Sequence, residues 1–240
     1  MGIDKAEIVF GGRTLLENAV TAMRSVSDQV VIVGERKEVP ADVMCLPDMF
    51  AGCGPIGGME TALRDCEQNG AKLAAFLPID TPLLPGGLLR GLVEFWSERE
   101  TVRVGVAVAD GYVQPLISVL HVDLQPALRA RLEAGDHKLQ PALRSAASAL
   151  AEKLDVVLNE VFVQTPIEFG DRVVLSPQGT PLHFLPTAEE WERRSMWFAN
   201  LNTPAELQRL LKGEQKGWPE VMPQIGTEHP RKISERQNSR

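Results

Sequence analysis

Two hydrophobic periodicities alternate along the first half of the chain. In one, apolar residues recur three and four positions apart, as on a helix face; in the other, short runs are almost entirely apolar, as in a buried strand. Strands that are apolar on both faces and separated by amphipathic helices are typical of a mostly parallel sheet. The pattern predicts an α/β sandwich with helices on both faces of the sheet. Helices are expected over residues 15–23, 55–66 and 85–96, and strands over residues 29–34, 43–46, 72–80 and 102–109.

The alternation is less regular after residue 110. Little periodicity, mixed charges and three prolines follow residue 212. We therefore expect one domain over residues 1–212 and a disordered or loosely attached tail over residues 213–240. Within the domain, strands are expected over residues 112–120, 156–164 and 171–185, the last with a hairpin turn at 177–180, and helices over residues 124–134, 139–154 and 203–211.

Composition narrows the classes of function. The chain has 240 residues, a net charge of −7 and a pI near 5.2, which disfavours a surface built for the nucleic-acid backbone. The longest apolar runs are shorter than the roughly 18 residues of a membrane span, and the opening residues lack the charged-then-apolar pattern of a secretory leader, so neither is expected. Cys45, Cys53 and Cys66 show no paired spacing, which favours packing roles in a reducing compartment. We expect a cytoplasmic protein with small-molecule or protein partners, without nucleic acid or membrane.

The segment FLPIDTPLLP, residues 76–85, places Asp80 at the carboxyl end of an expected strand. Ligands of α/β sheets bind at this edge, and a carboxylate there suits Mg²⁺, which is typically shared with substrate phosphates. The alternative is that Asp80 only caps the turn or helix that Thr81 and Pro82 begin. On this stretch alone the two interpretations carry equal weight.

A glycine-rich loop, GCGPIGG, contains the pattern G-x-G-x-x-G at Gly52, Gly54 and Gly57. The dinucleotide fingerprint needs its first glycine directly after a strand, whereas residues 47–51 intervene here, so that interpretation is disfavoured. A loop leading into a helix at Pro55 can still approach a nucleotide or receive an anion. A tight turn without a ligand is the simpler alternative.

Three further polar residues are candidates for binding. In FANLNTPAEL, residues 198–207, Asn200 and Asn202 are expected on one face of a short strand, where two amides offer ligands or hydrogen bonds; solvent exposure is equally compatible. The following TPAE is a capping box and needs no functional explanation. Lys5, in the opening MGIDKA, looks like the end of a phosphate-binding loop, although lysines are usually solvated. No nucleophile motif supports covalent catalysis.

Seven segments match one known family in order and approximate spacing: MGIDKA, PD at 47–48, GPIGGMETAL, LPIDTPLLP, QPLISVL, LEAGDHKL and FANLNTPAEL. In them the chain resembles the molybdenum cofactor guanylyltransferases, apart from an insertion over residues 165–192. The two segments IDTPLLP and NLNTPAEL, taken together, are specific for this family. The resemblance implies a Rossmann-like nucleotidyltransferase that joins GMP from Mg²⁺-bound GTP to the phosphate of molybdopterin and releases pyrophosphate. It also implies contact with cofactor-delivery proteins or molybdoenzymes.

The resemblance also implies catalytic residues. Lys5 matches the family lysine that meets the nucleotide's phosphates, and Asp80 matches the metal-binding aspartate. Asn202 matches an active-site asparagine, with Asn200 beside it. Attack by a phosphate oxygen on the α-phosphorus brings anions together, so positioning and charge neutralisation by Mg²⁺ and lysine suffice.

The implied nucleotide contacts lie between the second strand and the following helix. Asp48 matches a guanine-nucleotide contact, and Gly54 and Pro55 match the loop that bounds the nucleotide pocket. Val33 stands where the family often has an asparagine, which leaves one base or ribose contact unassigned. Two alternatives stay open: a nucleotidyltransferase of the same fold that uses CTP or a sugar phosphate, and a non-catalytic nucleotide-binding or cofactor-binding protein.

The opening MGIDKA generates a prediction about the upstream sequence. It resembles the back half of a family signature whose front half is an apolar strand followed by L-A-G-G-x-S-x-R. Without that strand, its neighbours in the sheet would have buried backbone groups that lack hydrogen-bond partners. Each such group costs about 1 to 3 kcal/mol of folding free energy. We therefore predict that in-frame upstream codons encode about 10 to 25 more residues, enough for one strand and its loop.

The test compares GTP binding and unfolding of the 240-residue and extended chains. The shorter chain is expected to bind GTP poorly and to be less stable. An in-frame stop without the glycine motif, together with GMP transfer by the present chain, would overturn this expectation.

Overall fold

The computed structural model describes residues 4–36, 38–169, 174–175, 182–201 and 206. The chain divides into two compact units, residues 1–202 and 203–240, and the elements below belong to the first. The helix expected over residues 203–211 and the tail expected over residues 213–240 lie outside the described residues, apart from Glu206. None of the helices in the described ranges is long and apolar enough to cross a membrane.

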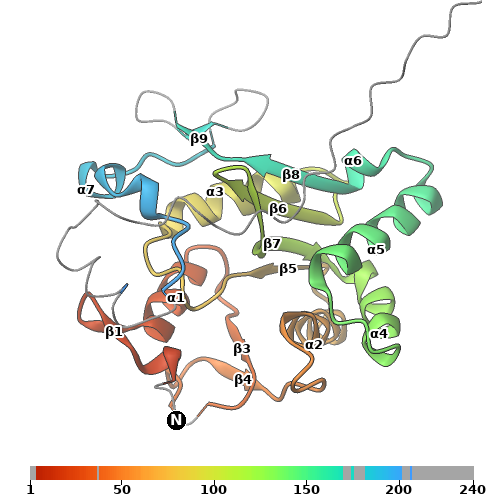
Figure 1. The fold of residues 1–240 in the computed structure, drawn as a ribbon, viewed down its shortest axis with the longest axis horizontal. Coiled ribbons are helices and arrows are strands. Elements are labelled where there is room, and N and C mark those ends of the chain that lie inside the picture. The colour runs from red at the N-terminus through yellow and green to blue at the C-terminus, as the bar shows by residue number, and fades with distance from the viewer. Residues whose placement is uncertain (1–3, 37, 170–173, 176–181, 202–205, 207–240) are drawn as a thin grey trace, which may run out of the picture. The chain divides into compact units, whose positions relative to one another are not determined.

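The main sheet has the strand order β5-β7-β6-β8 (Figure 1). β5, β6 and β8 share one direction, while β7 runs against both of its neighbours. The reversal occurs at Asp110 and Gly111, whose φ angles of 50° and 79° suit a hairpin of the Asp-Gly type. The strands are β5 (Leu73–Phe76), β6 (Val104–Ala109), β7 (Tyr112–His121) and β8 (Phe162–Pro166).

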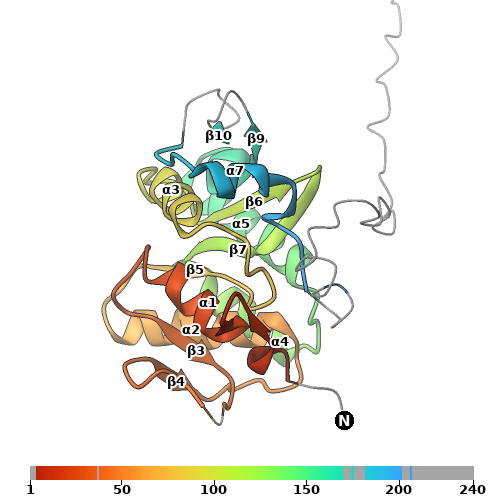
Figure 2. The same cartoon turned by 90° about the vertical axis from the view of Figure 1, so that its left-hand side faces the viewer.

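A separate parallel pair, β3 (Val31–Val33) and β4 (Met44–Leu46), lies on the β5 side of the main sheet (Figures 1 and 2). Among the described residues, β3 pairs only with β4 and β5 only with β7. Each therefore has one edge without a strand partner in this part of the chain. The upstream strand expected from the sequence stays a prediction that the described residues do not test.

Helices cover both faces of the main sheet, as predicted. One hydrophobic cluster joins α2, α4 and α5 to one face, and a second joins α3 to the other. Helix α1 packs against α3. The helices are α1 (Leu15–Met23), α2 (Pro55–Gln68), α3 (Gly86–Ser97), α4 (Gln125–Glu133), α5 (Leu139–Leu154), α6 (Leu158–Val161) and α7 (Ala188–Glu192), with 3-10 turns η1 (Lys5–Glu7), η2 (Val122–Leu124) and η3 (Arg194–Met196).

Two expected strands differ from the structure. Residues 156–164 begin with the short helix α6 before β8, because Val161 packs into the core on α6 and the ladder with β6 begins at Phe162. Of residues 171–185, the described residues 174–175 form β10 (Val174–Leu175), which pairs with β9 (Glu168–Phe169), and the described residues 182–185 form no strand. The expected turn at 177–180 lies outside the described residues. Near the N-terminus, β1 (Val9–Phe10) and β2 (Arg13–Thr14) form a small hairpin.

Trp96 on α3 lies directly over Gly105 of β6. A Cβ atom added at Gly105 would lie 2.3 Å from Trp96 Cγ. The indole Nε1–H donates a hydrogen bond of 2.8 Å to Thr165 Oγ1 on β8, and both groups are buried. The ring is therefore held against the sheet and has no room to move away from a methyl group.

This contact predicts that Gly105→Ala destabilises the fold by about 3 kcal/mol or more, because overpacking a rigid core displaces backbone or side chains. The matched control is Gly91→Ala on α3, where an added Cβ would meet ordinary contacts at 3.6 Å. We expect the control to be neutral or stabilising by up to about 1 kcal/mol through helix propensity. Urea unfolding of both variants measures the difference, and equal stabilities would contradict the packing account.

Candidate active site

Asp80 lies in the turn that follows β5, at the carboxyl end of that strand. Its backbone carbonyl accepts a hydrogen bond of 2.8 Å from the Leu201 N–H. In the same turn, the buried Thr81 donates its hydroxyl to the Pro78 carbonyl at 3.1 Å. The Asp80 side chain remains one-fifth exposed. The turn is thus fixed by hydrogen bonds to its backbone carbonyls, which leaves the Asp80 carboxylate available to another partner.

That partner is Lys5, whose Nζ lies 3.1 Å from Asp80 Oδ2. Lys5 lies on η1, where Asp4 caps the turn by accepting the Ala6 N–H, and Ala6 is buried against Leu16 and Val20. The lysine side chain is 41% exposed, so the ion pair itself contributes only about 0 to 1 kcal/mol to stability. Two candidates that are 75 positions apart in sequence therefore meet in the fold. The carboxylate bonds to Lys5, which favours a site over the capping alternative.

The segment that contains Asn200 passes beside Asp80 but is not a strand. The Ala199 N–H closes a turn on the Met196 carbonyl, and Leu201 makes one backbone bond to Asp80 while burying its side chain. The expectation that Asn200 lies on a strand face is therefore wrong, because this single bond does not extend into a ladder. Asn202 lies outside the described residues, so its placement stays a prediction.

The loop between β4 and α2 holds the other candidates. Asp48 Oδ1 accepts the Phe50 N–H at 2.9 Å, and Thr61 Oγ1 on α2 accepts the Met49 N–H at 3.3 Å. The loop then enters α2 at Pro55, as predicted. These bonds fold the loop onto the first turns of α2 and fix the orientation of Asp48.

The glycines of this loop have local structural causes. Gly52 and Gly54 have φ angles of 82° and 71°, a region that glycine adopts without strain. A Cβ atom at Gly57 would lie 2.8 Å from the Phe50 carbonyl oxygen, so the loop can approach α2 only at a glycine. The G-x-G-x-x-G pattern is explained by two turns and one close approach. Gly54 leaves the N-terminus of α2 without a side-chain cap, which is compatible with an anion there.

Arg36 is a cation near the site that the sequence patterns did not identify. It follows β3, and its Nη1 lies 3.7 Å from Oδ2 of Asp4, the residue before Lys5. The rule that identified Asp80, a charged residue after a buried strand, would also have selected Arg36. Val33, at the end of β3, lies against Gly58 of α2, so this side chain packs on a helix.

The donor set fits a magnesium ion shared with a substrate. Within the described ranges, no three His, Cys, Asp or Glu side chains form a group that could hold a metal. Mg²⁺ commonly takes one or two carboxylates and fills its remaining positions with water and phosphate oxygens. Asp80 can supply such a carboxylate, with Lys5 as the competing cation at Oδ2.

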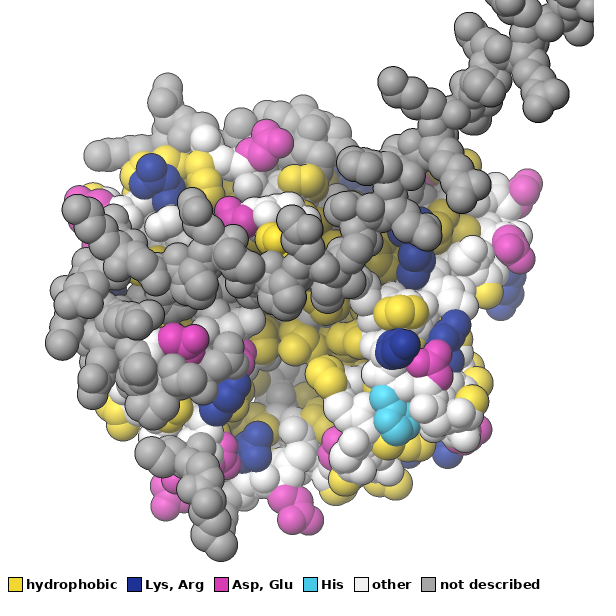
Figure 3. Space-filling view, viewed as in Figure 1, with side chains coloured by type: hydrophobic (Ala, Val, Ile, Leu, Met, Phe, Trp, Pro, Cys, Tyr) yellow, Lys and Arg dark blue, Asp and Glu magenta, His cyan; other side chains and the backbone are white. Residues whose placement is uncertain are grey.

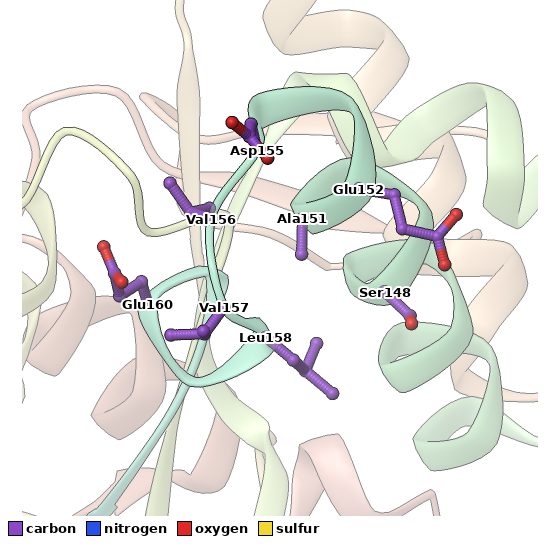
Figure 4. Close-up of a pocket in the computed structure, with 8 residues that line it drawn as sticks. All are labelled: Ser148, Ala151, Glu152, Asp155, Val156, Val157, Leu158 and Glu160. Atoms are coloured by element: carbon purple, nitrogen blue, oxygen red, sulfur yellow. The ribbon is translucent and has the colours of Figure 1, made fainter.

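The cysteines and the cavities contribute no further candidate. All three cysteines are free, and burial raises the pKa of the Cys66 thiol, which suits packing and disfavours a nucleophile. One cavity of about 490 Å³ is bounded by α1, residues 82–86 and α7. Another, of about 480 Å³, lies where α5 ends and α6 begins (Figure 4). Neither is lined by Lys5, Asp48 or Asp80. Figure 3 instead shows hydrophobic side chains around a hollow where Figure 1 draws β3, β5 and α2.

The sequence of the chain is similar to those of known nucleotidyltransferases. The profile of the MobA-like NTP transferase domain matches residues 1–153. The molybdenum cofactor guanylyltransferase of Aliivibrio fischeri is 30% identical over 141 residues, which cover 58% of this chain and 70% of that protein. A probable molybdenum cofactor guanylyltransferase of Carboxydothermus hydrogenoformans is 26% identical over 213 residues, 88% of this chain and 89% of the relative.

A solved structure extends the similarity to the fold. Molybdopterin-guanine dinucleotide biosynthesis protein A from Archaeoglobus fulgidus superposes with a TM-score of 0.57 at 19% identity, over 87% of this chain and 89% of that one. The family profile, in turn, covers the part of the chain that contains Lys5 and Asp80. The chain is therefore a nucleotidyltransferase and belongs to the MobA-like NTP transferase family.

Proposed function

We propose that this chain transfers GMP from GTP to the phosphate of molybdopterin or the molybdenum cofactor and releases pyrophosphate. The named relatives support the substrates. The observation that supports the chemistry most directly is the 3.1 Å contact between Lys5 and Asp80 at the carboxyl end of β5. A lysine and a carboxylate at this edge suit a reaction in which phosphate charge must be neutralised and positioned.

The reaction needs no covalent protein intermediate. A phosphate oxygen of the acceptor forms the new bond to the α-phosphorus of GTP, and the bond between the α-phosphorus and the bridging oxygen breaks with its electron pair going to pyrophosphate. Lys5 would meet the nucleotide's phosphates and reduce repulsion between the two anions. Asp80 would hold Mg²⁺, which supplies charge neutralisation and orientation when bound.

The remaining candidates have separate roles in this proposal. Asp48 would contact the guanine nucleotide, and Gly54 and Pro55 would bound its pocket at the uncapped start of α2. Asn202 would act beside the reacting phosphates. Asn200 would be an additional contact, and the bond of its neighbour Leu201 to the Asp80 backbone supports this role.

Turnover assays test the proposal as a whole. Purified chain, in its present and upstream-extended forms, is incubated with molybdopterin, Mg²⁺ and either GTP or CTP, and pyrophosphate and the dinucleotide product are quantified. GTP-dependent product supports the assignment. Product with CTP alone would replace the guanylyl assignment, and nucleotide binding without product in either form would indicate a non-catalytic role.

Asp80→Asn is predicted to reduce Mg²⁺-dependent transfer by more than about a hundredfold, a barrier increase of about 2.7 kcal/mol. The fold should survive because the lost ion pair is partly exposed. Asp42→Asn is the control, since Asp42 also pairs with a basic side chain, that of Arg24, but at the surface. The rate constants of the two variants test whether Asp80 is the metal ligand. Activity of Asp80→Asn within about tenfold of the parent would exclude this role.

Lys5→Met is predicted to tighten binding of Mn²⁺, used as a probe for Mg²⁺, in the absence of nucleotide. Removing the cation at Asp80 Oδ2 eliminates a competitor, so we expect a gain in affinity of about three- to fivefold, the upper part of the range for a pair worth up to about 1 kcal/mol. Turnover should fall in the same variant because the phosphates lose their lysine. Metal titration of the parent, Lys5→Met and Lys5→Met with Asp80→Asn measures both effects. Equal affinities of the parent and Lys5→Met would contradict the competition.

A further inference from the structure

Glu60 is a carboxylate enclosed in the core outside the candidate site. It lies on α2, and its side chain is 0% exposed. Its Oε1 accepts a hydrogen bond of 2.6 Å from Gln125 Nε2 on α4, while Oε2 has no hydrogen-bond partner within the described residues. A buried carboxylate of this kind needs compensation from neighbouring groups. The compensation comes from α4, which lies beside α2 (Figure 1).

Arg129, one turn after Gln125 on α4, supplies the nearest opposite charge. Its Nη1 lies 3.8 Å from Glu60 Oε1, and its Nε lies 3.0 Å from Glu133 Oε1. The side chain is 45% exposed. The guanidinium is therefore held by one carboxylate from the interior and another from its own helix, which restricts its position.

The same guanidinium lies over the ring of Phe50, with 5.9 Å between Cζ and the ring centroid. Phe50 belongs to the β4–α2 loop, and its N–H bonds to Asp48. A guanidinium within about 6 Å of an aromatic face attracts it. Two structural elements thus act on this loop: α2 through Thr61 and the close approach at Gly57, and α4 through Arg129.

We propose that Arg129 is a positioning residue for the nucleotide. It does not touch the substrate; Glu60 and Glu133 orient it, and it holds Phe50 so that Asp48 faces the nucleotide. The part that concerns the nucleotide rests on the proposed function, because it assumes that Asp48 contacts the guanine nucleotide. The part that concerns the loop rests only on the contacts among Glu60, Arg129 and Phe50.

Two measurements on Arg129→Met test the two parts separately. Hydrogen exchange at the Phe50 and Cys53 amides should accelerate by at least fivefold, because the loop loses its anchor on α4. The KM for GTP should rise five- to tenfold while kcat changes less than twofold. Arg131→Met is the matched control, an arginine on the same helix that pairs with Asp136 away from this loop, and it should leave both quantities unchanged.

Arg129→Met leaves the buried charge of Glu60 without its partner and can therefore lower stability in general. A second variant that also removes the Glu60 charge separates this effect from the loss of the loop anchor. In Glu60→Gln with Arg129→Met, the melting temperature should recover toward that of the parent, while loop exchange and the KM stay raised. Phe50→Leu should raise the KM similarly, and adding Arg129→Met to it should have little further effect if the two residues act through each other. Unchanged loop exchange in the stabilised double variant overturns the proposal. Faster loop exchange in a chain whose upstream-extended form also binds no GTP retains the loop anchor and refutes the proposed function alone.

Discussion

Among the described strands, the strand that presents Asp80 has only one hydrogen-bonded neighbour. β5 pairs with β7 alone, from Leu73 opposite His121 to Phe76 opposite Ser118. β7 is in turn held by β6 through the hairpin at Asp110 and Gly111. The position of the Asp80 carboxylate therefore depends on an antiparallel strand that follows it in sequence. The bonds from Lys5 and Leu201 then fix the turn itself.

Local periodicity was sufficient to predict most elements of the first half of the chain. Leu88, Leu92 and Trp96 form the buried stripe expected of α3, and Pro55 begins α2 as its fixed φ allows. The position of Asp80 was also predictable, because an apolar strand presents its carboxyl end to the ligand side. The hydrophobic pattern of β7 did not predict its reversed direction. A strand buried on both faces has the same apolar pattern whether it runs parallel or antiparallel to its neighbours. The Asp-Gly pair before it was the available signal.

The sequence patterns did not predict contacts between segments that are distant in the chain. Lys5 meets Asp80 only because the 3-10 turn around Ala6 docks on α1, and Arg36 lies near Asp4 only because β3 ends beside that turn. The burial of Glu60 was likewise hidden, because a charged residue in an amphipathic helix is normally expected on its solvated face. Asn200 was misassigned for a related reason: a polar residue between apolar ones suggests alternation in a strand, whereas here one backbone bond to Asp80 determines the path of the chain.

The charge balance of the site clarifies how an acidic protein can receive a polyanion. With a net charge of −7, the chain offers little long-range attraction to phosphates, so neutralisation has to be local. Lys5 already compensates Asp80, and its 41% exposure leaves it within reach of an entering ligand. In the proposed reaction, the phosphates would replace Asp80 as the partner of Lys5. The cation that accompanies the phosphates would replace Lys5 as the partner of Asp80. Each group would exchange one opposite charge for another, so neither would be left uncompensated in a partly buried site, where an unpaired charge is most costly.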